Sequence, residues 1–318
     1  MPIFSSAVVE YCRPFVEWNN EWPPLPLSND VQMEWWSQWM TSTKEDQQWI
    51  ELSKCLPQLL IQVEKNAREG IQYKRLVLQG AEASAADLDG GMAEPHGFNL
   101  SIAEHWSGSM PVITVDKGED FKNILRCLVY RCEPVEIQSS VHSQAISGLI
   151  HWGLIRKIDR SKRCALLILH NAPYSSLDFK GISGVDNYEQ WLRLSHQWRL
   201  EHELTHIACK AVVGEMRLNL YDELLADCMG MLKSIGHFSS KLFAKGLGVT
   251  EEGLFTESSR MHAYTRELNV QDKSVVSQLA FERAVELEQM LDGELKGIDN
   301  ISLLRLLARN TLDKKLST

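Results

Sequence analysis

The sequence predicts an α+β protein that is mainly helical. Apolar residues recur at helical spacing in most of the chain, above all in its last third. Two short, unbroken apolar runs, 111–115 and 164–170, are typical of buried strands. We therefore expect three regions: a Trp-rich, mostly helical N-terminal region (1–73), an α/β core with a small mixed sheet (74–236) and a helical C-terminal region (237–318).

The N-terminal region is rich in tryptophan, with six of the ten tryptophans in the first 49 residues. The Pro- and Trp-rich stretch 1–30 predicts an extended arm, and helices are expected over about 29–42 and 44–67. The tryptophans indicate either anchors that dock these helices on a core or an aromatic wall for an apolar substrate or partner.

The middle of the chain supplies the predicted sheet. Residues 74–78 (KRLVL) add a third short strand to the two apolar runs. The Gly/Ala/Ser/Asp-rich stretch 80–109 is expected to be a long loop. Two helices are expected, over 120–131 and over about 139–150, the second capped by a serine.

A long helix follows, and it is the most distinct element of the sequence. Asp186 and Glu189 have the spacing of a capping box and mark its start, and the helix is expected to end before Gly214. Beyond it, apolar residues at helical spacing predict four further helices, over about 239–246, 257–267, 272–291 and 300–312.

The long helix carries the sequence HELTH, residues 202–206. Side chains at i and i+4 lie on the same helix face, so His202 and His206 can offer two imidazole nitrogens to one ion. A catalytic zinc ion has three protein ligands and an open position for water. Glu203 is therefore the candidate general base for that water.

A second segment, DELLAD, supplies what the first lacks. Its Glu223 is the candidate third ligand, on a helix that the intervening loop can fold back against the first. Metal-bound histidines usually donate their other ring proton to a carboxylate. Asp227, one turn beyond Glu223, is placed to accept that proton from His202, and Asp222 to accept it from His206.

Two alternatives remain open. Cys209 lies on the same helix face as the two histidines, and a thiolate is a good zinc ligand. It could join the ion only by distorting the helix, and a lone cysteine is more often a small buried apolar residue. The second alternative has no metal and consists of two amphipathic helices with solvated carboxylates and a hydrogen-bonded histidine pair.

Over roughly residues 186–230 the chain resembles the gluzincin metallopeptidases, the thermolysin-like group, whose pattern is HExxH and then a glutamate with an aspartate four residues later. Gly230, three residues after Asp227, agrees with this pattern. The resemblance implies a zincin-like core, with the sheet beside the HExxH helix and one zinc ion in a cleft. The chain also looks similar to a group of uncharacterised bacterial HExxH proteins, through the segments EPVEIQSS, GLIHW, RLEHELTH and MRLNLYDELLAD.

The gluzincin resemblance implies contacts with a substrate backbone. In that group an edge strand upstream of the HExxH helix pairs with the substrate, and an Asn-Ala pair contributes to this in thermolysin-like enzymes. Asn171 and Ala172 occupy a similar place here, directly after the 164–170 strand. The match is loose, because Pro173 has no N–H to donate.

The resemblance also implies residues downstream of the metal ligands. Gluzincins commonly use a histidine or tyrosine to stabilise the oxyanion, and an arginine to hold the substrate. In this chain we expect Arg260 to bind substrate and Tyr264, with His262 second, to stabilise the oxyanion. Arg260 and Tyr264 share a face at i and i+4. The alternative is a solvated helix face with a half-buried tyrosine.

Composition limits the partners and the compartment. A formal net charge of −9 without a basic run speaks against nucleic acid and anionic membranes. Seven cysteines without a C-x-x-C pair indicate a reducing compartment. The start of the chain does not resemble a signal peptide, and no run reaches the roughly 18 apolar residues of a membrane span. We therefore expect a cytoplasmic protein, of a size that leaves the oligomeric state open.

These observations predict a zinc-dependent hydrolase that cleaves a peptide or amide bond in a peptide or a small amide-containing substrate. Glu203 would activate the zinc-bound water while the ion polarises the carbonyl. One alternative is a zinc enzyme that acts on a small non-peptide metabolite of the natural-product type. Another is a catalytically idle, zinc-stabilised interaction protein, which would need no base at position 203.

Overall fold

The computed structural model describes residues 4–13 and 22–317, and the chain divides into two compact units. The sheet unit runs from Pro26 to Ala172, and the helical unit combines Met1–Leu25 with Pro173–Thr318. This division differs from the three predicted regions, because the predicted core, 74–236, is shared between the two units.

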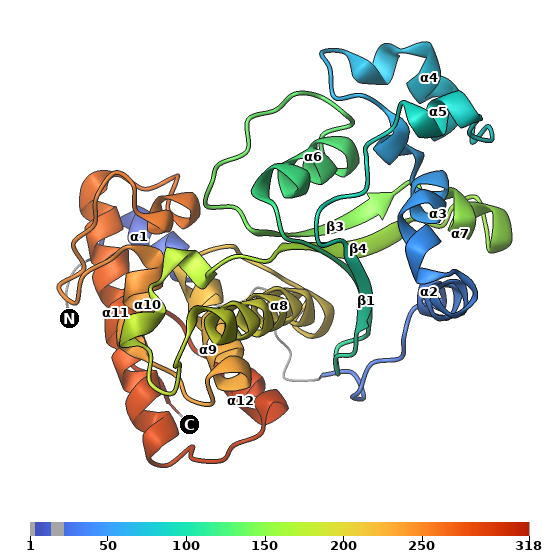
Figure 1. Cartoon of the computed structure of the whole chain (residues 1–318). Helices are drawn as coiled ribbons and strands as arrows, with labels where there is room; N and C mark the ends of the chain where they lie inside the picture. The colour runs from blue at the N-terminus through green and yellow to red at the C-terminus, as the bar shows by residue number, and fades with distance from the viewer. Residues whose placement is uncertain (1–3, 14–21, 318) are drawn as a thin grey trace. The chain divides into compact units, whose positions relative to one another are not determined.

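The sheet unit is built on four strands, which Figure 1 shows in green. Their order is β1-β2-β4-β3, with β2 and β4 parallel and the two outer pairs antiparallel. The central strand β4 is the predicted apolar run, and its residues are largely buried, as expected for a strand that is covered on both faces. The strands are β1 (Asn99–Ala103), β2 (Met110–Val115), β3 (Ser143–Leu149) and β4 (Cys164–His170).

Helices surround this sheet and share its core. Trp35, Trp36 and Trp49 are buried, which confirms the prediction that these tryptophans anchor helices on a core. Trp18 lies outside the described residues. The helices of the unit are α2 (Val31–Ser42), α3 (Gln48–Cys55), α4 (Ile71–Tyr73), α5 (Ala85–Asp89), α6 (Gly118–Leu128) and α7 (Trp152–Lys157), with short helical turns at Glu45–Gln47, Pro57–Leu60, Ala67–Glu69 and Lys74–Leu78.

Four predictions for this unit are wrong. The helix expected over about 44–67 is interrupted after α3, which ends at Cys55, and only short helical turns follow. Lys74–Leu78 is a helical turn that continues α4 and not a strand. The prediction failed because an apolar run this short does not distinguish a strand from a helix. The stretch 80–109 is no single loop, since it contains α5 and β1. The predicted helix over 139–150 is strand β3, which is stabilised by its antiparallel pairing with β4.

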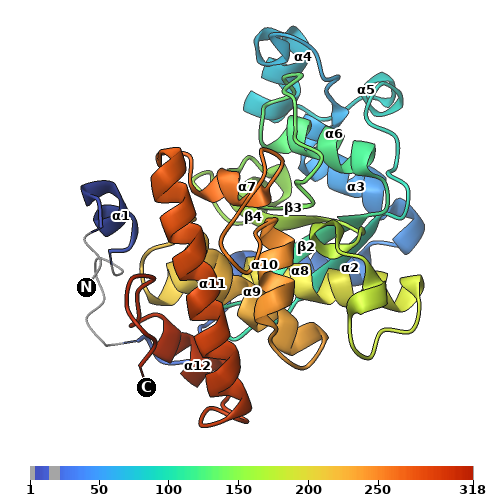
Figure 2. The same cartoon turned by 90° about the vertical axis from the view of Figure 1, so that its left-hand side faces the viewer.

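In the helical unit, the two helices that carry the motifs lie side by side: α8 (Tyr188–Val212) and α9 (Leu220–Ser234) (Figures 1 and 2). The cap of α8 is Asn187, whose side chain accepts the N–H of Gln190, and not the predicted Asp186. The predicted end before Gly214 is confirmed. Gly214 has a φ of 88°, which allows the chain to turn back toward α9.

The rest of the helical unit packs around this pair. The N-terminal stretch includes a helix, so the predicted extended arm is wrong for those residues. The predicted helix over 257–267 is only a short 3-10 turn, η7. No helix of the described residues is long and apolar enough to cross a membrane. The remaining elements are α1 (Ser6–Tyr11), η5 (Tyr174–Ser176), η6 (Phe179–Gly181), α10 (Ser240–Leu247), η7 (Arg260–Tyr264), α11 (Val270–Asp292) and α12 (Asn300–Leu307).

Candidate metal centre

Three buried side chains meet where α8 and α9 pack together. His202 and His206 come from successive turns of α8, and Glu223 comes from the first turn of α9. Their exposed fractions are 4%, 6% and 1%. One nitrogen of each histidine and one oxygen of the glutamate all lie within 4.8 Å of one another. The structure thus brings together the three side chains that the sequence predicts as ligands.

The spacing of these atoms fits a zinc ion. The two Nε2 atoms are 3.1 Å apart, and Oε1 of Glu223 lies 3.2 Å from Nε2 of His206. Oε2 of Glu223 lies 3.6 Å from Nε2 of His202. Tetrahedral bonds of 2.0–2.1 Å place two ligand atoms about 3.3 Å apart. Because these distances involve both oxygens of Glu223, the two nitrogens and the glutamate carboxylate have separations close to those between ligand atoms around one zinc ion.

Asp227 fixes the orientation of His202. Its Oδ1 atom lies 2.9 Å from Nδ1 of His202, as predicted. An imidazole that donates from Nδ1 has its lone pair on Nε2, so Nε2 faces Glu223 and His206 as an acceptor. Nδ1 is thus the protonated nitrogen in this arrangement.

Asp222 has a different place from the predicted one. Its Oδ2 atom accepts the backbone N–H of Arg217 and, over 2.7 Å, that of Leu218. The side chain therefore closes the loop that precedes α9 and does not serve as the hydrogen-bond acceptor of His206. Burial raises the pKa of Asp222, while the backbone donors and the charge of His206 oppose that change.

The charged forms of Glu223 and of the basic side chains around it stabilise one another. Burial alone would favour neutral Glu223, but His202, His206 and Arg260 lower its pKa to about 2. Burial likewise disfavours a charged His206, but the Glu223 carboxylate raises the pKa of that histidine to about 9. The charged forms of His206 and Glu223 therefore stabilise each other.

Arg260 lies at the centre, in direct contact with Glu223. Its Nη2 donates to Oε2 of the glutamate over 2.7 Å, and its Nε lies 3.0 Å from the hydroxyl of Tyr264. Arg260 and Tyr264 are thus neighbours, although the helix on which their spacing was interpreted is only a 3-10 turn. His262 is directed elsewhere, since its Nε2 contacts the carbonyl of Thr256 over 3.0 Å. The roles in substrate binding and oxyanion stabilisation stay predictions.

Sequence reasoning missed two residues of the centre, Tyr174 and Trp198. The hydroxyl of Tyr174 donates to Oδ1 of Asp227, and Trp198 Nε1 donates to the same oxygen over 3.0 Å. The two rings stack with centroids 4.3 Å apart. Trp198 lies one helical turn before His202, so its place on the α8 face was the only signal in the sequence.

Gly230 explains how Trp198 reaches this position. A Cβ atom at residue 230 would lie 2.4 Å from the Cδ1 atom of the Trp198 ring. Only a residue without a side chain leaves room for the indole between α8 and α9. The glycine of the motif thus permits the hydrogen bond from Trp198 to Asp227.

Asn171 and Ala172 belong to the sheet unit, at the end of β4. The edge strand expected there is wrong, because β4 lies between β2 and β3 and both of its edges are paired. The N–H of Asn171 donates to Val115 over 2.8 Å, and its carboxamide donates to Asp116 over 3.1 Å. Their predicted contact with substrate is therefore unsupported by the strand order.

Glu203 and Cys209 differ sharply in exposure. Glu203 is half-buried, between the buried residues His202 and Leu204. Cys209 is buried, and burial raises the pKa of its thiol well above the usual range. The group of neighbouring ligand atoms contains His202, His206 and Glu223 without Cys209. This arrangement speaks against the thiolate as a third ligand.

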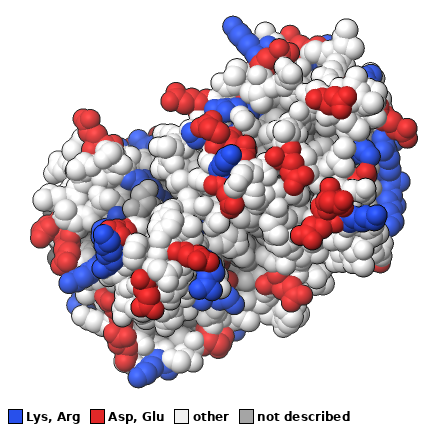
Figure 3. All heavy atoms as spheres, viewed as in Figure 1, with Lys and Arg blue, Asp and Glu red and all other residues white. Residues whose placement is uncertain are grey.

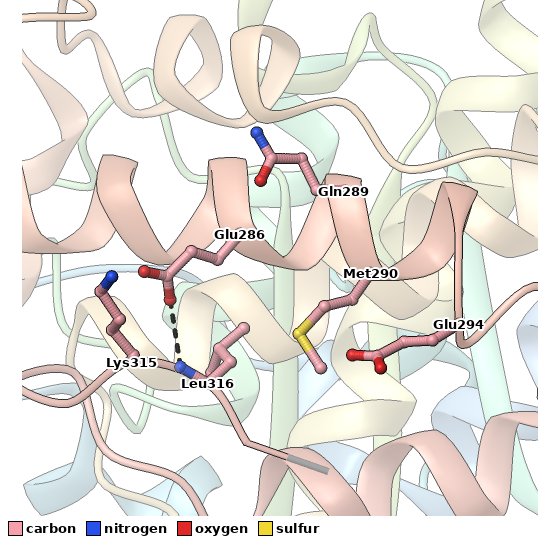
Figure 4. Close-up of a pocket in the computed structure, with 6 residues that line it drawn as sticks. All are labelled: Glu286, Gln289, Met290, Glu294, Lys315 and Leu316. Atoms are coloured by element: carbon pink, nitrogen blue, oxygen red, sulfur yellow. Dashed lines mark hydrogen bonds between the residues drawn. The ribbon is translucent and has the colours of Figure 1, made fainter.

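Two pockets of the helical unit differ in their relation to the centre. A pocket of about 250 Å³ is lined by Tyr11, residues 217–219 and residues 263–268; Tyr264 links it to Arg260, and none of the three candidate ligands lines it. A pocket of about 420 Å³ lies between α11 and the C-terminal segment (Figure 4). There Glu286 accepts the N–H of Leu316 over 3.0 Å, and no residue of the metal centre lines the pocket.

Comparison with known proteins gives one family. A family model described as a family of unknown function, DUF7005, matches residues 7–165 and 160–315, which together span nearly the whole chain. No curated protein and no solved structure matches the chain.

Proposed function

We propose that the chain, which belongs to the DUF7005 family of unknown function, is a zinc-dependent hydrolase that cleaves a peptide or amide bond. The observation that carries this proposal is three separations of 3.1–3.6 Å: His202 Nε2 to His206 Nε2, His206 Nε2 to Glu223 Oε1, and His202 Nε2 to Glu223 Oε2. Nitrogen and oxygen donors at this spacing suit one zinc ion with an open fourth position. A zincin-like core, with α8 as its active helix, is part of the proposal.

A bound zinc ion supplies Lewis acidity, which lowers the pKa of a water and polarises the carbonyl to be cleaved. Glu203 then acts as the general base, because it directly follows His202 on the same helix and is only half-buried. Asp227 keeps the Nε2 lone pair of His202 directed at the centre. Tyr264 is the proposed donor to the oxyanion, beside Arg260.

We infer a small substrate from the pocket that Tyr264 lines, although none of the three candidate ligands lines it. Its volume of about 250 Å³ lies below the usual range for drug-sized ligands, and the three ligand side chains are buried. A short peptide or a small amide-containing molecule therefore fits better than a long polypeptide. The same observation supports the alternative of a zinc enzyme for a small non-peptide metabolite.

We place the protein in the cytoplasm, because none of its seven cysteines forms a disulfide. Nucleic acid and membranes are not among the proposed partners. On the face seen in Figure 3, acidic side chains are interspersed with basic ones, and the net charge of the chain is −9.

The test of this function is hydrolysis of a panel of short peptides and small amides by zinc-loaded protein. Removing the metal with a chelator should abolish turnover, and adding zinc should restore it. Glu203→Gln should keep the metal and lower turnover about 10²–10⁴-fold, since the amide cannot accept the proton of the water. Glu189→Gln, an exposed change on the same helix, is the control. Undiminished turnover by Glu203→Gln would contradict the role of the base.

A further inference from the structure

The turn at Pro173–Ser175 brings two consecutive side chains to the metal centre. Neighbouring side chains in an extended segment point in opposite directions. Here Ser175 has φ 46° and ψ 30°, a left-handed conformation that a residue with a Cβ atom rarely adopts. This conformation turns the chain so that Tyr174 and Ser175 both contact residues of the centre.

The side chain of Tyr174 contacts His202 and the carboxylate that orients it. The hydroxyl of Tyr174 donates to Oδ1 of Asp227, the oxygen that also faces Nδ1 of His202. The same hydroxyl lies 3.0 Å from Nδ1 of His202. Tyr174 is 4% exposed, and its ring is held by stacking on Trp198. Tyr174 thus fixes the carboxylate that orients the first ligand.

The side chain of Ser175 contacts Arg260, the arginine that binds the carboxylate of Glu223. Oγ of Ser175 accepts from Nη1 of Arg260 over 2.6 Å, while Nη2 of the same guanidinium donates to Glu223 over 2.7 Å. A guanidinium is planar and its N–H groups have fixed directions. Holding Nη1 at Ser175 therefore fixes where Nη2 meets Oε2, and leaves Oε1 of Glu223 to face His206.

The turn is itself fixed to the helix that carries the histidines. The N–H of Tyr174 donates to Oγ of Ser195 over 3.0 Å, and the carbonyl of Pro173 accepts from Nη2 of Arg199 over 3.1 Å. Both partners are buried on α8, within two turns of His202. The strained conformation of Ser175 is thus held by two contacts of the residues that precede it, as is typical of strain at functional sites.

We propose that Tyr174 and Ser175 form a positioning element for the metal centre. Tyr174 sets the orientation of His202 through Asp227, and Ser175 sets that of Glu223 through Arg260. The inference deepens the proposed function and rests on it, because it assumes that these ligands hold a metal. It assigns roles to two residues that lie outside both sequence motifs.

The test measures the zinc dissociation constant of the full chain by competition with a chelator. Loss of such an outer partner usually weakens metal binding about 10- to 100-fold, and we expect this for Tyr174→Phe and for Ser175→Ala. Tyr188→Phe and Ser302→Ala, at exposed positions of the same unit, should leave the constant unchanged. The visible spectrum of the cobalt-loaded protein should shift in the two test variants and not in the controls, because it reports ligand geometry.

A coupling experiment separates positioning from a general loss of stability. If Tyr174 acts through Asp227, Tyr174→Phe should add nothing to the loss caused by Asp227→Ala, which removes the acceptor of the hydroxyl. Full additivity of the two losses would overturn the Tyr174 role. If Tyr174→Phe does not fold, Ser175→Ala still tests the second contact, since it removes only a half-buried hydroxyl.

The zinc measurements distinguish failure of the positioning element from failure of the proposed function. Wild-type protein that binds zinc, with both variants at the wild-type dissociation constant and spectrum, would overturn the positioning element alone. Wild-type protein that binds no zinc would overturn the proposed function, and the inference with it.

Discussion

Arg260 donates to Oε2 of Glu223 over 2.7 Å, so the third candidate ligand has one oxygen held by a guanidinium and one directed at His206. The same guanidinium lies over the ring of Tyr264, 5.5 Å from its centroid. An arginine from η7 thus determines which oxygen of a glutamate on α9 is available to a metal. The role of η7 in the site is therefore to supply the arginine that binds Oε2 of Glu223.

Replacing Arg260 should therefore weaken metal binding. In Arg260→Gln the buried carboxylate of Glu223 loses a charge-assisted hydrogen bond and is free to rotate. We expect the zinc dissociation constant to rise about 10- to 100-fold, as for other losses of outer partners. Chelator competition measures it, and Arg266→Gln, at an exposed position six residues on, is the control. Equal constants for both variants would show that Arg260 serves only the substrate.

Tyr264→Phe should lower turnover more than it weakens substrate binding. The hydroxyl lies 3.0 Å from Nε of Arg260, and Tyr264 lines the pocket of about 250 Å³, so this hydroxyl is the proposed donor to the oxyanion. Removing an oxyanion donor usually costs about 10²–10³-fold in kcat. Steady-state kinetics with a substrate from the panel separates kcat from KM. A rise in KM with unchanged kcat would assign Tyr264 to binding.

Gly230→Ala should destabilise the helical unit. Its new Cβ would lie 2.4 Å from the buried ring of Trp198, and overpacking of this kind costs about 1–3 kcal/mol. Denaturant unfolding should show the loss. Gly181→Ala, where nothing lies within 4 Å of the added atom, is the control and should change little. Equal stability of the two variants would mean that α8 and α9 can separate at no cost.

His151 should make the sheet unit sensitive to acid. Its ring is buried against Trp35 and Trp36, and burial lowers its pKa from 6.5 to about 3. Between these pH values the unfolded chain binds a proton that the folded chain does not, so the free energy of unfolding falls as the pH falls below 6.5. The slope contributed is at most about 1.4 kcal/mol per pH unit.

Denaturant unfolding between pH 7 and pH 4 tests this, over the window set by that shift. His151→Asn removes the titrating ring but keeps a side-chain oxygen to cap α7 at Leu154, so the variant should show a shallower dependence on pH. His237→Asn, at an exposed histidine, should keep the wild-type slope. A wild-type slope in His151→Asn would refute the assignment.

The sequence predicts the helices and strands whose own apolar periodicity is enough to identify them. The β4 run and the motif helices α8 and α9 have the periodicity of buried strands and amphipathic helices, and the structure contains them. The strand β3 was missed because its sequence, SQAISGL, has no clear alternation and becomes a strand through pairing with β4. Propensity cannot reveal a strand that depends on its partner.

The same limit applies to the site. The spacing of His202 and His206 on one helix, and of Glu223 and Asp227 on another, was enough to bring the candidate ligands together. Tyr174 could not be found in this way. It reaches the centre through a turn with a left-handed residue, and that geometry has no periodic signal in the sequence.

Elemental analysis of the purified protein reports whether His202, His206 and Glu223 hold one zinc ion. After expression with sufficient metal, we expect about one equivalent of zinc per chain, lost in the His202→Ala/His206→Ala double variant and in Glu223→Ala. Less than about half an equivalent in the wild type, or an unchanged content in the double variant, would contradict the metal site. Full zinc content in Glu223→Ala would show that another group is the third ligand.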